Sequence, residues 1–111
     1  MPHPWLHDDG STVTLDLHGA TVDEAVRLTR RTVQEAARRG RSTVKVIHGA
    51  STSRRLAPNR TIKNALYAEL DGDAFGVDLT GHWRDEAAVT LSLDLTAARD
   101  PRPIRMRDLD V

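Results

Sequence analysis

The chain has 111 residues, enough for one compact domain and too few for two. It contains no cysteine, which excludes disulfides, thiolate catalysis and cysteine-based zinc sites. Its sixteen basic and sixteen acidic residues cancel, and no apolar run approaches the ~20 residues that span a bilayer. The first residues also lack the apolar core of a signal peptide. We therefore expect a cytoplasmic protein with no membrane partner.

The zero net charge hides a strong segregation of charge along the chain. Residues 27–63 hold eleven basic residues and one acidic residue, whereas the remainder holds five basic and fifteen acidic residues. Such segregation can steer a polyanion toward one side of a neutral molecule. We expect a positive surface that binds nucleic acid, made by Arg27, Arg30, Arg31, Arg54, Arg55 and Arg60. The alternative is that these arginines only solvate the outer face of a helix.

The first half of the chain reads as a strand, a helix and a second strand. Residues 12–17 alternate between apolar and polar side chains, as in a half-buried strand, and residues 1–11 form an extended lead-in to it. Residues 21–24 have the pattern of a capping box, and the helical spacing that follows stops at Gly40. Residues 43–49 are almost continuously apolar, which is typical of an interior strand. This order predicts a right-handed crossover between two parallel strands.

The second half predicts one more helix and two more strands. Residues 62–70 have helical apolar spacing, and residues 77–80 and 88–95 alternate like strands. Because each clear strand keeps a polar face, we expect helices on one face only of a mixed four-stranded sheet, in a domain of the α/β class with the two layers of an α+β sandwich. The domain covers residues 12–95, and residues 96–111 are expected to be a loosely packed arm.

A histidine followed by a glycine ends each of the first two strands, as His18-Gly19 and His48-Gly49. The carboxyl ends of parallel strands lie on one rim of a sheet, where α/β folds bind ligands and helix N-termini present amides to anions. Histidines can act as acid and base in phosphodiester cleavage near neutral pH. Asp16 shares the parity of His18 along the strand and can orient that ring.

We therefore predict that Asp16, His18 and His48 are catalytic. Nucleic-acid contacts are expected from the arginines named above and from Gly19, Gly49 and Ser51. Simpler explanations exist for each group. A histidine that ends a strand is commonly bonded to a nearby carbonyl, and an aspartate at this place can form a turn by bonding its own backbone.

These motifs resemble those of the Smr (small MutS-related) domain family. They are Asp16-Leu17-His18-Gly19, the helix start at residues 21–25 and Ile47-His48-Gly49, and the resemblance covers roughly residues 13–95. It implies a β-α-β-α-β-β two-layer sandwich, similar to the C-terminal domain of translation initiation factor three. It also implies nucleic-acid binding, and in several members endonuclease activity on DNA or RNA.

Two departures from the family pattern bear on activity. Ser51 replaces the last glycine of the second motif, and the basic loop that follows is longer than in short-loop members. The leading hypothesis is an endonuclease that needs no metal or is weakly assisted by a divalent metal, with no metal ligand assigned. The alternative is a non-catalytic module that binds RNA or the ribosome, and a third possibility is a structural domain whose C-terminal arm exchanges between subunits.

Overall fold

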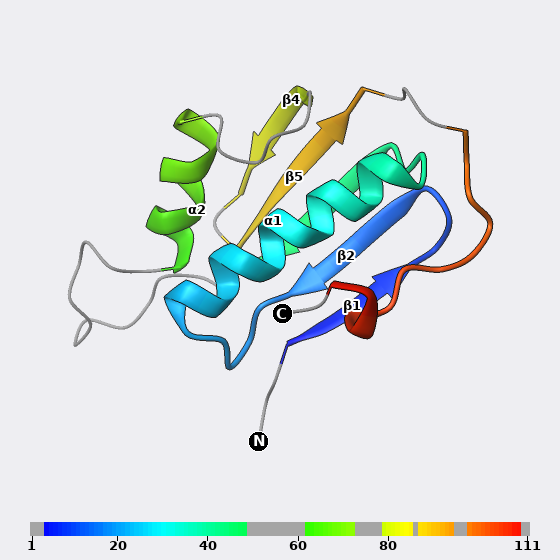
Figure 1. Ribbon diagram of the computed structural model, residues 1–111. Helices are drawn as coiled ribbons and strands as arrows, with labels where there is room; N and C mark the ends of the chain where they lie inside the picture. The colour runs from blue at the N-terminus through cyan, green and yellow to red at the C-terminus, as the bar shows by residue number, and fades with distance from the viewer. Residues whose placement is uncertain (1–3, 49–61, 73–78, 86, 95–97, 110–111) are drawn as a thin grey trace.

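The computed structural model describes residues 4–48, 62–72, 79–85, 87–94 and 98–109. In this part of the chain two helices pack on one side of a five-stranded sheet (Figure 1). The elements in chain order are β1 (Trp5–Asp8), β2 (Thr12–Asp16), α1 (Val22–Arg38), β3 (Thr43–Ile47), α2 (Ile62–Asp71), β4 (Leu79–Arg84), β5 (Ala88–Leu93) and the short 3₁₀ helix η1 (Met106–Leu109).

The sheet has the strand order β1-β2-β3-β5-β4. Strands β2 and β3 pair in parallel through the crossover helix α1, and every other neighbouring pair is antiparallel. The predicted α+β class and the predicted parallel pair of strands are therefore confirmed. The parallel pairing also places the carboxyl ends of β2 and β3 side by side on one rim of the sheet.

The prediction of four strands was wrong by one strand. Residues within the expected lead-in form β1, which pairs antiparallel with β2 and makes one edge of the sheet. The alternation in this strand is hidden because Leu6 faces the core beside a carboxylate, Asp8, whose side chain is fully buried in an ion pair. A hydropathy pattern reads such a buried carboxylate as a surface residue.

Strand β4 also differs from its prediction. It runs from Leu79 to Arg84 at the other edge of the sheet, beyond the expected end at residue 80. All its residues after Leu79 are exposed, so this segment offers no alternation of apolar and polar side chains. The first two residues expected in this strand, 77 and 78, lie outside the described part of the chain.

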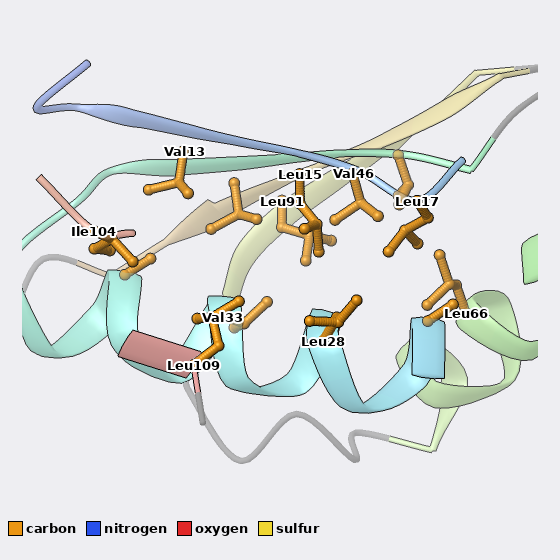
Figure 2. Packing of buried hydrophobic residues seen from close by; sticks show 14 of the residues in the cluster. Val13, Leu15, Leu17, Leu28, Val33, Val46, Leu66, Leu91, Ile104 and Leu109 are labelled. Atoms are coloured by element: carbon orange, nitrogen blue, oxygen red, sulfur yellow. The ribbon is translucent and has the colours of Figure 1, made fainter. Parts of the chain in front are cut away.

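The core fills the space between the sheet and the helices (Figure 2). Alternate side chains of β2, β3 and β5 point toward α1, which contributes Leu28 and Val33, and α2 adds Leu66. Two residues of the C-terminal segment complete this core, since Ile104 is 2% exposed and Leu109 is 0% exposed. The expectation of a loosely packed arm was therefore wrong for these residues. Their apolar side chains are separated by charged ones in the sequence, so no apolar run indicates that they are buried.

A buried ion pair joins the N-terminal strand to the C-terminal segment. The Asp8 carboxylate accepts from Arg41 Nε at 2.8 Å, and both side chains are 0% exposed. The backbone amide of Ile104 donates to Asp8 Oδ2 at 2.7 Å, and Arg41 donates in turn to the carbonyls of Asp100 and Arg102. Burial disfavours the charged carboxylate, but the bonds from Arg41, Ile104 and the Gly10 amide outweigh it and hold the pKa of Asp8 below its usual range.

Candidate functional site

A tight turn joins β2 to α1 and carries His18. The Leu17 amide donates to the Ile47 carbonyl at 2.9 Å, which extends the parallel pairing up to the rim, and the Ala20 amide closes the turn on the Leu17 carbonyl at 3.0 Å. Gly19 has a φ of 84°, a left-handed conformation that suits glycine at this position of a turn. The expected proximity of the two strand ends is thereby confirmed.

Asp16 holds His18 through two bonds to one carboxylate oxygen. Asp16 Oδ1 lies 2.6 Å from the Nδ1 atom of His18 and accepts from the His18 backbone amide at 2.9 Å. The carboxylate is nearly buried, with 11% of the side chain exposed, whereas 62% of the His18 side chain is exposed. The arrangement fixes the ring on its Nδ1 side and leaves Nε2 as the nitrogen that can meet a ligand.

His48 has a different environment from His18, although the sequence presents the two alike. Its backbone amide donates to the Ala87 carbonyl at 2.9 Å, and its half-buried ring packs edge-on against Tyr67 of α2, with ring centroids 6.0 Å apart. The Nε2 atom of His48 is buried. The structure thus places both histidines on one rim, one exposed and one packed against a helix.

Two residues that the sequence analysis missed, Tyr67 and Arg84, belong to the same rim. Arg84 ends β4, and its guanidinium lies 4.3 Å from the centroid of the Tyr67 ring while also pairing with Asp71 at 2.9 Å. The Tyr67 hydroxyl donates to the Asp85 carbonyl at 3.3 Å. No local sequence pattern identifies Tyr67 and Arg84 as site residues. They lie near His48 because of the order of the strands in the sheet and not because of their spacing in the chain.

The N-terminus of α1 is capped by its own side chains. The Thr21 hydroxyl accepts from the Glu24 amide at 3.1 Å, and the Glu24 carboxylate accepts from the Thr21 amide at 3.2 Å, so the predicted capping box is confirmed. These bonds hold the pKa of Glu24 below its usual range. Asp23 also lies in the first turn, so two carboxylates at this helix start oppose the phosphate binding that the sequence suggested for it.

The three described arginines of the expected basic surface have different roles. Arg30 pairs with Glu69 and so ties α1 to α2, and the carboxylate raises the pKa of Arg30. Arg31 donates from Nε to the Leu109 carbonyl at 2.9 Å. Arg27 is exposed and lines a groove between the two helices, whose wall also includes Asp23 and Glu69. A phosphate on this face would compete with carboxylates and a carbonyl for Arg30 and Arg31.

Several predicted site residues lie outside the described part of the chain. They are Gly49, Ser51, Arg54, Arg55 and Arg60. Among the residues that the structure does describe, no group of three or more histidine, aspartate or glutamate side chains gathers as a metal site. In the described residues, the candidate site therefore consists of the Asp16–His18 pair, His48 with Tyr67 and Arg84, and the arginines of α1.

The fold and this rim define a small α+β domain with a histidine at the end of each strand of a parallel pair. The family model of the Smr domain matches residues 15–74, more than half of the chain, and the chain belongs to the Smr domain family. This family is nucleic-acid-binding and nuclease-like. No curated protein and no solved structure gives a significant match. None of the helices in the described residues is long and apolar enough to cross a membrane.

Proposed function

We propose that this chain is an endonuclease that cleaves phosphodiester bonds of nucleic acid, with His18 as its principal acid–base group. One observation carries the proposal: a nearly buried carboxylate, Asp16, holds an exposed imidazole at the sheet rim through its Nδ1 atom. A carboxylate that accepts from Nδ1–H stabilises the imidazolium and fixes the tautomer whose Nε2 lone pair can take a proton.

In the proposed reaction, His18 Nε2 removes the proton from the hydroxyl that attacks phosphorus. The attacking oxygen forms its bond to phosphorus, the ester bond to the leaving oxygen breaks, and the leaving oxygen takes a proton from an acid. His48 is assigned the role of that acid or of a phosphate contact. Contacts with the nucleic acid backbone are assigned to the residues expected from the sequence, Gly19, Gly49, Ser51, Arg54, Arg55 and Arg60.

The alternative function is a non-catalytic module that binds RNA or the ribosome. A specific observation favours it: the ring of His48 packs against Tyr67, and its Nε2 atom is buried. Cleavage by two histidines needs both rings to reach one phosphate. If His48 stays in this position, a single exposed imidazole remains for the chemistry on the described part of the rim.

The test compares wild type with His18→Ala and His48→Ala on labelled RNA and on supercoiled plasmid, with and without chelator. His18→Ala should slow cleavage about 10²- to 10⁴-fold, the usual loss for one acid–base group, while its affinity for nucleic acid stays within a factor of two or so. The cleavage rate of the wild type should rise and then fall with pH, because one group acts deprotonated and another protonated. Wild type that binds but never cuts supports the alternative, and Ser51→Gly is then the variant to examine.

A further inference from the structure

The face of the sheet away from the helices is open in the described part of the chain. Helices α1 and α2 and the 3₁₀ helix η1 all lie on the other side (Figures 1 and 2). The strand registers define one row of side chains across the open face, one residue from each strand. The row consists of His7, Thr14, Lys45, Thr90 and Trp83.

Two tryptophans stand at opposite edges of this face. Trp83 on β4 is 71% exposed, and Trp5 on β1 is 46% exposed; they are the exposed large hydrophobic residues of the described chain. Between them the row carries His7, the hydroxyl side chains of Thr14 and Thr90, and an exposed cation, Lys45. The nearly buried carboxylate of Asp16 belongs to the same face, opposite Trp5. Exposed indole rings are costly to leave in water and are typical of surfaces that bind a partner.

The open face leads directly to the candidate site. Trp5 is the cross-strand partner of Asp16 in the β1–β2 ladder, and side chains of directly opposed residues lie about 5 Å apart. Asp16 is the residue that holds His18. A ligand that touches Trp5 on this face is therefore beside the Asp16–His18 pair.

We propose that single-stranded RNA docks across the open sheet face, with bases stacked on Trp83 and Trp5 and with Lys45 against a phosphate. This inference rests on the proposed nuclease function, because the docked RNA would be the substrate of the site at His18. Unpaired bases stack on exposed aromatic rings, whereas the bases of a duplex are hidden in its interior. The hydroxyl side chains of this face can exchange hydrogen bonds with ribose 2′-hydroxyls, which act as both donors and acceptors.

The dimensions of the face suit a short stretch of chain. Four strand spacings separate β1 from β4, which places the two tryptophans about 20 Å apart. A few nucleotides cover this distance, in keeping with the ~4–16 nucleotides that a single-strand-binding domain contacts. The opposite, helical side is less suited to a polyanion, because Glu69 pairs with Arg30 there and the helix start is acidic.

The experiment uses the full chain and an unstructured oligouridylate of about ten nucleotides, a length within the range of known sites. Because the chain has two tryptophans, Trp5→Phe and Trp83→Phe each leave a single tryptophan, whose fluorescence is excited selectively at wavelengths where tyrosine does not absorb. Stacking should quench the fluorescence of both variants on titration with the RNA. Trp83→Ala should weaken binding about 5- to 150-fold, the range for losing one aromatic stacking platform, and Lys45→Gln should lower the salt slope by about 0.7.

His82→Ala is the matched control, because His82 is exposed on the same strand and points to the other side of the sheet. It should leave the affinity unchanged. Full-strength binding by Trp83→Ala with no quenching would overturn the proposal while leaving the proposed nuclease function intact. Equal binding of the same RNA annealed to its complement, or preferred binding of the matching DNA strand, also overturns it. A chain that binds no nucleic acid overturns both proposals.

Discussion

At the scale of single residues, the two histidines of the rim show that contacts between near neighbours in the sequence are predictable, whereas contacts between distant elements are not. His18 and Asp16 are two positions apart on a strand, so their shared side of the sheet follows from the alternation alone, and the structure places them in contact. His48 follows its strand in the same way, but its neighbour Tyr67 comes from a helix that no spacing rule connects to it. The local pair was predictable and the long-range contact was not.

Asp16→Asn tests the role of the carboxylate in holding the ring. The amide can still accept from the His18 backbone, but it carries no charge to stabilise an imidazolium and can present its NH₂ group to Nδ1. We expect the cleavage rate to fall about 10²- to 10⁴-fold, no further than for His18→Ala, with the fold unchanged by circular dichroism. A rate equal to wild type would remove Asp16 from the mechanism.

Gly19→Ala tests the turn that carries His18. With a φ of 84°, an alanine at this position is forced into the left-handed region, which costs about 1–2 kcal/mol. Urea unfolding should show a loss of this size. Gly81→Ala is the matched control, because an added Cβ meets nothing within 4 Å at that position. The free energy of unfolding of this variant should not fall below that of wild type. Equal effects of the two substitutions would contradict this account of the turn.

At the scale of elements, helix α1 was the part of the fold that the sequence predicted most fully. The capping box, the amphipathic spacing and the stop at Gly40 are all local signals, and all are seen in the structure. The edge strands β1 and β4 were predicted poorly for a physical reason. An edge strand packs on few neighbours, so its sequence carries a weak apolar alternation, and Asp8 and Trp83 even reverse it.

Thr21→Ala tests how far the helix start depends on its cap. The variant loses the hydroxyl that accepts from the Glu24 amide, and the free energy of unfolding should fall by about 1 kcal/mol. Thr21→Ser keeps the hydroxyl and should retain most of that stability. The measurement is the midpoint of urea unfolding, with the dependence of the unfolding free energy on urea concentration (the m value) unchanged. If serine and alanine prove equally destabilising, the loss comes from packing of the threonine methyl group and not from the cap.

At the scale of the whole molecule, the buried Asp8–Arg41 pair links strand β1, near the start of the described chain, to the C-terminal segment at residues 100–104. It joins β1, the C-terminal end of α1 and the segment at residues 100–104 through bonds to carbonyls and an amide. Asp8→Asn leaves the Arg41 charge buried without its carboxylate, which should cost about 3–5 kcal/mol of stability near pH 7. Asp9→Asn, a neighbouring change at an exposed position, should cost much less.

The same pair should make stability depend on pH in a defined direction. The pKa of Asp8 lies below its ordinary value of 3.8 in the folded protein. The ionised Asp8 carboxylate therefore contributes its full stabilisation of the folded protein at pH values above 3.8. This stabilisation is lost as the pH falls through the lower pKa of the folded state. Urea unfolding from pH 7 to pH 2 should show the stability difference between wild type and Asp8→Asn shrinking in acid. A difference that grows in acid would contradict the assignment.

The contact between Asp8 and the Ile104 amide spans 96 positions of the sequence, so it also bears on the order in which the fold can form during synthesis. Strand β1 is made well before the amide that its carboxylate binds. Until residue 104 has been made, Asp8 lacks part of the network that stabilises it when buried, so we expect β1 to pack late and β2 to stay an edge of the growing sheet. Trp5 belongs to β1 and would reach its place opposite Asp16 only then. We therefore expect a nascent chain that is shorter than this to form the His18 turn before the adjoining part of the open sheet face.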